Sequence, residues 1–161
     1  MIEIQVEDPA WAGALPDVEA VVRRAAAAVL GGAPMPDDEA LATVLLEDDE
    51  AVQALNARFR DRDAPTNVLS FPAPAVPGAP TEDTYLGDII LAFGVCRREA
   101  VDQGKSLAHH LSHLVIHGLL HLQGHDHQAD EEAELMEARE RTLLAGLGID
   151  DPYRAILDRE P

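Results

Sequence analysis

The segment His117–His127, with the sequence HGLLHLQGHDH, holds four of the chain's seven histidines. It completes a longer run, SLAHHLSHLVIHGLLHLQG, whose regularly spaced leucines predict a largely buried helix that stops at Gly124. On such a helix His117 and His121 lie one turn apart on one face, which lets two imidazoles bind a single metal ion. All seven histidines fall between His109 and His127, so the sequence predicts that any metal chemistry is concentrated here.

A third ligand has to come from outside this helical turn. His113 continues the same face, but at about 1.5 Å of rise per residue it lies about 12 Å from His121. Two nitrogens bound to one ion at about 2.1 Å are at most about 4.2 Å apart, so His113 and His121 cannot share it. After Gly124 the chain can reverse and bring back His125 or His127, and His127 gives the fuller spacing HxxxHxxxxxH. Three imidazoles with an open fourth position are typical of a catalytic zinc site.

Other interpretations of the histidine-rich helix are open. A structural metal is the main competitor of a catalytic one, and His109 and His110 are interpreted as capping or surface residues. A metalloprotease of the HExxH type needs a glutamate beside the first histidine, where this chain has Gly118. Asp88 and Asp126 are candidates for a general base, or for carboxylates that orient a ligand imidazole.

Composition favours one cytoplasmic domain. The 161 residues, 47% of them hydrophobic, suffice for a single domain over residues 1–161, in which 150–161 are expected to form a loose tail. No apolar run approaches the roughly 20 residues that span a bilayer, and the N-terminal MIEIQVEDPAW has no signal-like pattern. The single cysteine, Cys96, fits a reducing compartment, so we expect a cytoplasmic protein without a membrane partner.

Patterns of strands and helices alternate along the rest of the chain. Strands are predicted at 2–7, 40–48, 68–74 and 85–93, and helices at 17–30, 48–60, 96–103, 106–124 and 129–148. Prolines and glycines predict loops at 33–38 and 72–83. This order predicts an α+β fold: a single domain with a four-stranded mixed sheet and about five helices. The metal site is expected on the penultimate long helix and the loop that follows it.

Four blocks of the sequence resemble a known family. HGLLHLQGHDH is similar to HGxLHLxG(Y)DH, the signature of the YbeY proteins, which are bacterial endoribonucleases and 16S rRNA maturation factors. LNARFRDRDAPTNVLSFP, YLGDIIL and MEARERTLLAGLGI resemble three further family blocks, so the resemblance runs roughly from Leu41 to Gly148. Phe59 and Asn67 replace the family's commoner tyrosine and aspartate.

The resemblance implies a ligand set and a phosphate-binding residue. His117, His121 and His127 are the implied ligands of one zinc ion, and His125 stands where the family most often has tyrosine. An extra imidazole at that position can substitute for His127 or rival it. Arg60 aligns with a family arginine of the active-site cleft, and a guanidinium suits phosphate because its planar fork makes bidentate, charged hydrogen bonds.

Other polar residues of that block have simpler explanations. Ser70 and Thr66 are explained almost as well by a strand hydroxyl and a turn cap, and Arg58 and Arg62 are interpreted as flanking charges.

Net charge complicates the interpretation as a ribonuclease. A formal charge of −18 argues against simple electrostatic attraction to nucleic acid, which normally favours a basic face. Only twelve residues are basic, yet Arg58, Arg60 and Arg62 cluster in NARFRDRD. We therefore expect local and modest RNA binding, helped by a partner surface.

The resemblance implies a zinc-dependent, single-strand-specific endoribonuclease that acts in 16S rRNA maturation and ribosome quality control. Zinc held by three imidazoles lowers the pKa of a bound water to about 7. The implied partners are rRNA or other single-stranded RNA, with ribosomal small-subunit proteins or an assembly GTPase, and neither DNA nor membrane.

Two other functions compete with the nuclease. A non-catalytic ribosome-assembly factor with a structural metal is the alternative, because acidic charge suits basic ribosomal proteins. Hydrolysis of a small phosphoester or amide is a weaker third reading.

Overall fold

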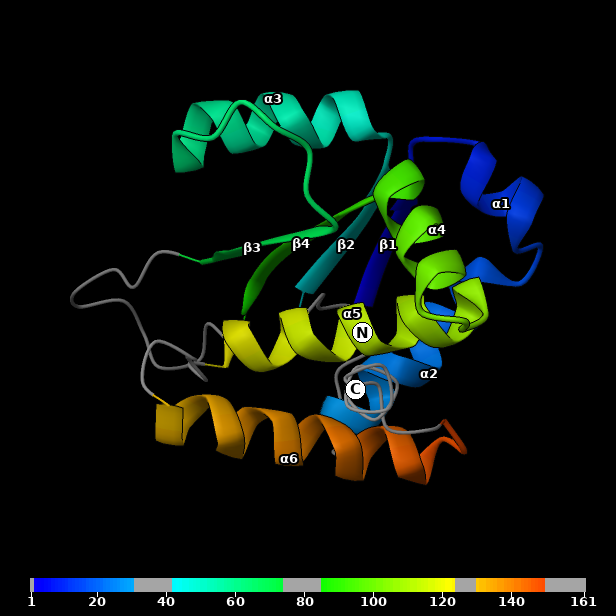
Figure 1. Cartoon of the computed structure of the whole chain (residues 1–161), viewed down its shortest axis with the longest axis vertical. Coiled ribbons are helices and arrows are strands. Elements are labelled where there is room, and N and C mark those ends of the chain that lie inside the picture. The colour runs from blue at the N-terminus through cyan, green and yellow to red at the C-terminus, as the bar shows by residue number, and fades with distance from the viewer. Residues whose placement is uncertain (1, 31–41, 74–84, 124–129, 150–161) are drawn as a thin grey trace.

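A mixed four-stranded sheet, in the order β1-β2-β4-β3, forms the centre of the protein (Figure 1). The structure is a computed structural model that describes residues 2–30, 42–73, 85–123 and 130–149. Its strands are β1 (Ile2–Val6), β2 (Ala42–Glu47), β3 (Val68–Pro72) and β4 (Gly87–Ala92). β1 and β2 are parallel, as are β2 and β4, whereas β3 is antiparallel to β4. The strand predicted at 85–93 is therefore confirmed as β4, which lies inside the sheet, and β1 and β3 form the edges.

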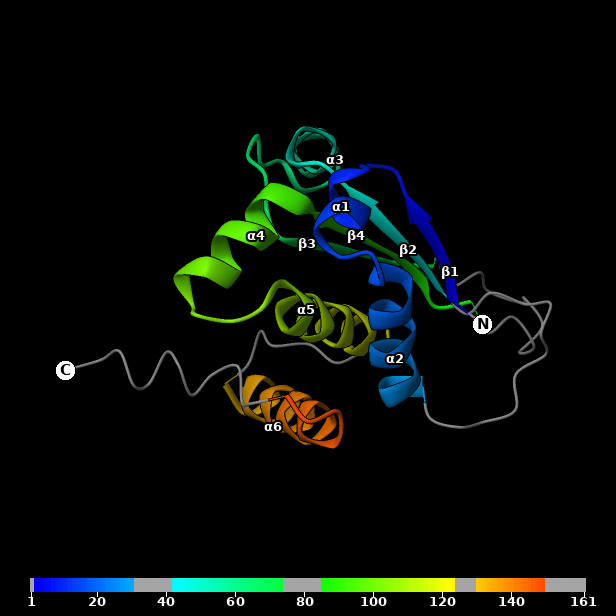
Figure 2. The ribbon, with the colours of Figure 1, turned by 90° about the vertical axis from the view of Figure 1, so that its right-hand side faces the viewer.

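Helices cover both faces of the sheet. They are α1 (Ala10–Ala14), α2 (Val18–Leu30), α3 (Asp49–Arg60), α4 (Phe93–Asp102), α5 (Leu107–Leu122) and α6 (Asp130–Gly146). α3 lies over one face, α2 and α5 lie under the other, and α6 packs beneath α5 (Figure 2). The histidine-bearing helix α5 is thus enclosed between the sheet and α6.

The position of α5 follows from its sequence. Ser106 caps its N-terminus, because the side-chain Oγ accepts a hydrogen bond from the backbone N–H of His109 at 3.1 Å. Gly118 allows a close approach to the sheet: a Cβ at this position would lie 3.1 Å from Ile89 and 3.2 Å from Ser70 Oγ. The absence of a side chain at Gly118 therefore lets α5 lie close to β3 and β4 at the residue that follows His117.

Helix α3 positions the arginine cluster. Asp48 is its N-cap and accepts a hydrogen bond from the backbone N–H of Ala51 at 2.8 Å. Asp61 ends the helix in the left-handed region at φ 57°. Buried Asn56 then donates to the Ala64 carbonyl at 2.8 Å and fixes the loop that leads to β3. Arg60 is the last residue of α3.

The predicted α+β fold with a four-stranded mixed sheet is confirmed, with six helices in the described residues instead of about five. The additional helix is α1. Its buried residue Trp11 anchors it, because the indole N–H donates a hydrogen bond to the Glu47 carbonyl at 3.0 Å. α4 begins at Phe93, three residues before the predicted start at Cys96. The interpretation of His110 as a capping or surface residue is wrong: it is 2% exposed and its Nε2 lies 2.9 Å from Glu99 Oε1.

Some predictions fall outside the described residues: the loop at 33–38, most of the loop at 72–83, and the tail at 150–161. Within the described residues, no helix is long and apolar enough to cross a membrane.

Candidate metal centre

His117 and His121 lie together on α5, as their spacing predicts. Their ring centroids are 4.7 Å apart, with an angle of 74° between the ring planes. Both side chains are half-buried, so they are held in place and still reach solvent. His127, the third predicted ligand, lies outside the described residues, as do His125 and Asp126.

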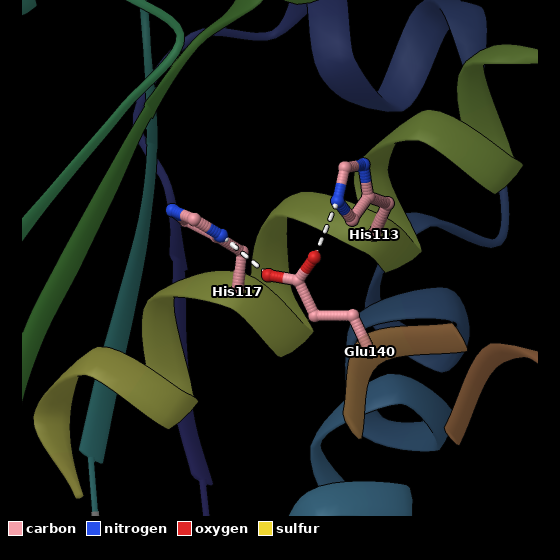
Figure 3. A group of neighbouring side chains, drawn as sticks. All are labelled: His113, His117 and Glu140. Atoms are coloured by element: carbon pink, nitrogen blue, oxygen red, sulfur yellow. Dashed lines mark hydrogen bonds and ion pairs between the residues drawn. The ribbon is translucent and has the colours of Figure 1, made fainter. Parts of the chain in front are cut away.

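A buried carboxylate from α6 binds two histidines of α5 (Figure 3). Glu140 is 0% exposed, and its Oε1 lies 2.5 Å from Nδ1 of His117. Its second oxygen, Oε2, lies 3.2 Å from Nε2 of His113. Glu140 thereby joins α6 to α5 at the histidine that begins the signature segment.

This contact determines which nitrogen of His117 is available. An ionised carboxylate only accepts hydrogen bonds, so Nδ1 of His117 carries the proton and donates it to Glu140. Nε2 then keeps its lone pair and is the nitrogen that can bind a metal ion. Metal-binding histidines are commonly oriented by a carboxylate in this way.

His113, His117 and Glu140 themselves form a group that can hold a metal ion, because their ligand atoms lie within 4.8 Å of one another. Two ligand atoms of a tetrahedral ion at about 2.1 Å stand about 3.4 Å apart. The 2.5 Å separation of His117 Nδ1 and Glu140 is shorter, and therefore describes a hydrogen bond. Burial lowers the pKa of His113, which favours the neutral imidazole, although the hydrogen bond to Glu140 acts in the opposite direction.

Arg60 reaches the edge of the sheet next to α5. Its Nη2 donates to the Ser70 carbonyl at 2.8 Å, and its guanidinium lies over the ring of Phe71, 5.2 Å from the centroid. Ser70 is also the residue whose Oγ lies beside Gly118 of α5. Ser70 of β3 therefore contacts Arg60 through its carbonyl, and its hydroxyl lies beside the turn of α5 that carries His117.

Asp88 is placed on the other face of the sheet. Its neighbour Ile89 faces Gly118 of α5, whereas Asp88 lines a cavity beside α3 and accepts a hydrogen bond from the Tyr85 hydroxyl at 2.5 Å. Asp88 therefore does not orient His117. The carboxylate that contacts His117 is that of Glu140. Thr66 lies half-buried in the loop before β3.

Glu140 is the site residue that the sequence reasoning missed. It lies between Met136 and Leu144 at a spacing of four residues, and all three are buried. A carboxylate that interrupts an apolar stripe of a helix needs a polar partner, since an unpaired buried charge is costly. The glutamate within this apolar stripe is the feature of the sequence that could have identified Glu140 as a buried, paired carboxylate.

Comparison with known proteins agrees with these features. The family model described as Endoribonuclease YbeY matches residues 5–148. The chain belongs to the YbeY family. Endoribonuclease YbeY of Paramagnetospirillum magneticum is 55% identical over 158 residues, which cover 94% of each chain. The YbeY of Azorhizobium caulinodans is 49% identical over 94% of this chain and 95% of its own.

A third relative, the YbeY of Rhodopseudomonas palustris HaA2, is 52% identical over 84% of this chain and 72% of its own. The resemblance inferred from the four sequence blocks is thus confirmed. Membership of the YbeY family makes the chain an endoribonuclease, a hydrolase that acts on RNA.

Proposed function

We propose that this YbeY protein is a zinc-dependent endoribonuclease that cuts single-stranded RNA in 16S rRNA maturation and ribosome quality control. His117, His121 and His127 are the proposed metal ligands, and Arg60 is the proposed phosphate-binding residue. The observation that carries the proposal is the contact between buried Glu140 and Nδ1 of His117, because it leaves Nε2 of a ligand-spaced histidine for a metal.

The chain's own residues prepare the site for hydrolysis. Glu140 fixes the tautomer and ring orientation of His117, and the helical spacing places His121 beside it. Zinc bound there would supply a Lewis acid and a water molecule of lowered pKa. Arg60 carries a permanent positive charge next to β3, where it can bind a phosphate oxygen and stabilise negative charge that develops during cleavage.

The acidic surface supports a second role beside this one. A net charge of −18 suits basic ribosomal proteins of the small subunit, or an assembly GTPase with a basic face, as partners. In the alternative function the protein is an assembly factor whose metal is only structural. Both roles concern ribosome assembly, and so the proposed place of action is the cytoplasm.

An arginine comparison tests the nuclease. Single-turnover cleavage of a single-stranded 16S rRNA fragment is measured for the wild type, Arg60→Ala and Arg62→Ala, where exposed Arg62 is the matched control. We expect Arg60→Ala to lose about 100-fold in rate, the usual effect of removing one transition-state donor, while Arg62→Ala keeps its rate. Equal cleavage by all three proteins would contradict the role of Arg60, and no cleavage by the wild type would favour the assembly factor.

A further inference from the structure

A cavity of about 560 Å³ lies between α3 and the sheet. It is on the face opposite α5, because Ile90 and Leu45 line it whereas Ile89 packs against α5. Phe59 and Phe71 contribute aromatic rings to its lining. His117 and His121, the proposed metal ligands within the described residues, are carried by α5 on the other face, so metal binding by these two side chains does not account for this cavity.

Aromatic rings and arginines alternate at the cavity. Phe59 is 56% exposed, and its ring centroid is 5.5 Å from that of Phe71, with the rings edge-on. The Arg58 guanidinium lies over the Phe59 ring at 5.1 Å, and that of Arg60 over the Phe71 ring at 5.2 Å. Proteins that bind single-stranded RNA use such surfaces, because every base has a face that stacks on an aromatic ring or guanidinium.

Charge decides how a nucleotide would lie there. Glu47 and Asp88 also line the cavity and would repel a phosphate, but their oxygens can accept hydrogen bonds from N–H groups of a base. The two arginines flank the aromatic rings and attract a phosphate. The base therefore belongs inside the cavity, and the phosphate belongs on the arginine side.

The arginine side leads towards the candidate metal centre. Arg60 donates to the carbonyl of Ser70, whose hydroxyl lies beside Gly118, the neighbour of His117. β3, which carries Ser70, is an edge strand, and the C-terminal ends of α3, β3 and α5 all point to the left in Figure 1. A single RNA strand that crosses this edge can thus contact the cavity, Arg60 and α5 in succession.

We propose that the cavity between α3 and the sheet binds one nucleobase of single-stranded RNA, stacked on Phe59, while Arg60 contacts the adjoining phosphate. The proposal rests on the proposed nuclease function and gives a physical reason for single-strand specificity. A base in a duplex must unpair and unstack before it can enter a protein pocket, which costs free energy. An unpaired base enters without that cost.

Photo-crosslinking locates the base directly. A single-stranded RNA that carries 5-iodouridine at one position is crosslinked to the wild-type protein on ice, and the attached peptide is identified by mass spectrometry. The iodouridine is moved along the RNA one position at a time. We expect one position to crosslink to Phe59 or Phe71, and crosslinks confined to peptides elsewhere would overturn the proposal.

Substitutions at Phe59 test whether stacking contributes to binding. Dissociation constants for the same RNA are measured with Phe59→Ala, Phe59→Leu and Phe59→Trp, and with Leu135→Ala, which removes a 71% exposed apolar side chain of α6. We expect Phe59→Ala and Phe59→Leu to bind about ten-fold more weakly. Phe59→Trp should bind as well as the wild type or better, and Leu135→Ala should be unchanged.

The results separate this proposal from the nuclease function. If Phe59→Ala binds and cleaves RNA like the wild type, the base site is wrong and the nuclease function stands. If RNA crosslinks to Phe59 but no variant or wild type cleaves it, the base site stands and the nuclease function is wrong. Equal weakening by Leu135→Ala would show that general surface hydrophobicity is measured, and would also overturn the base site.

Discussion

Glu140 is a buried side chain in a position to prepare the proposed metal site. Its two oxygens bind His117 and His113, so a carboxylate that is 0% exposed has an imidazole partner on each side. Burial of a charge without such partners would cost several kcal/mol. The same hydrogen bond that makes the burial tolerable also sets the tautomer of His117. The structural role of Glu140 and its proposed role at the metal site therefore depend on the same hydrogen bond, and a variant that keeps the shape of the side chain is needed to separate them.

Glu140→Gln keeps the size of the side chain but removes its charge. We expect zinc affinity, measured by competition with a chromogenic chelator, to fall about 10-fold to 100-fold, because the amide holds the His117 tautomer less firmly. Glu137→Gln is the control, since Glu137 lies on the same helix and its side chain is 40% exposed. Unchanged zinc affinity in Glu140→Gln would show that the contact with His117 serves folding alone.

At the scale of elements, the approach of α5 to the sheet depends on Gly118. Its missing Cβ leaves room for Ile89 and Ser70, whose atoms would stand 3.1 Å and 3.2 Å from that carbon. A Cβ at Gly146 of α6 would meet open space, so this glycine serves as a helical control.

We expect Gly118→Val to lower the free energy of unfolding by about 2–3 kcal/mol, because the branched side chain overfills the contact with β4. Gly146→Val should leave the free energy of unfolding nearly unchanged, because the new side chain meets open space and valine is no worse a helix former than glycine. Urea unfolding followed by circular dichroism measures both. Similar losses in the two variants would mean that α5 can move away from the sheet without penalty.

Three elements meet at Glu99 of α4. Its Oε1 lies 2.9 Å from Nε2 of buried His110 on α5 and accepts a hydrogen bond from the Asn67 amide before β3, also at 2.9 Å. The bond from His110 is the main reason that the pKa of Glu99 lies below its ordinary value, with Asn67 contributing and burial opposing. A carboxyl group whose pKa is lowered by folding stabilises the fold above its unfolded pKa, and this contribution disappears as the pH falls through the folded pKa.

Glu99→Gln should therefore destabilise the protein at pH 7 by about 1 kcal/mol, a modest value because the side chain is one-third exposed. The difference from the wild type should shrink as the pH falls through the lowered pKa of Glu99 in the folded protein, where Glu99 itself becomes protonated. Urea unfolding of both proteins at pH 7 and pH 3 measures this. If Glu99→Gln lowers the free energy of unfolding by the same amount at both pH values, ionisation of Glu99 does not contribute to stability as expected.

The same elements show what the sequence can predict. The four strands and the helix predicted at 48–60 follow from local patterns and are confirmed. Helix α1 was missed because its five residues are fixed by Trp11, whose partner Glu47 is 36 residues away. The contacts of His110 and Glu140 were missed because each has its partner on another helix: the interrupted apolar stripe of α6 indicates that Glu140 needs a polar partner, but no local pattern identifies that partner.

For the candidate site, the spacing of His117 and His121 was predictable and is realised on α5. The role proposed for Arg60 came from family resemblance, because an arginine at a helix end is otherwise an ordinary solvated charge. The structure adds its contact with Ser70, which lies beside the histidine helix.

For the whole molecule, the net charge of −18 limits how RNA can be bound. This charge argues against general attraction to RNA, so the proposed binding relies on Arg58 and Arg60, which lie over Phe59 and Phe71, together with base stacking. Such binding should respond weakly to salt.

With about two phosphate contacts, the logarithm of the RNA association constant should fall against the logarithm of salt concentration with a slope of about −1.4. Fluorescence anisotropy with a labelled single strand across a salt series measures the slope. A slope steeper than about −4 would indicate an extensive basic surface and contradict this account.

The central claim is that the metal bound through α5 is required for cleavage. The most direct test measures zinc content and RNA cleavage side by side for the wild type, His121→Ala and His109→Ala, where His109 is an exposed histidine of the same helix. We predict that His121→Ala stays folded but loses both zinc and cleavage, that His109→Ala keeps both, and that wild-type activity rises in proportion to zinc occupancy. Cleavage that persists in zinc-free wild type or in His121→Ala would contradict the claim, and the metal would then be structural.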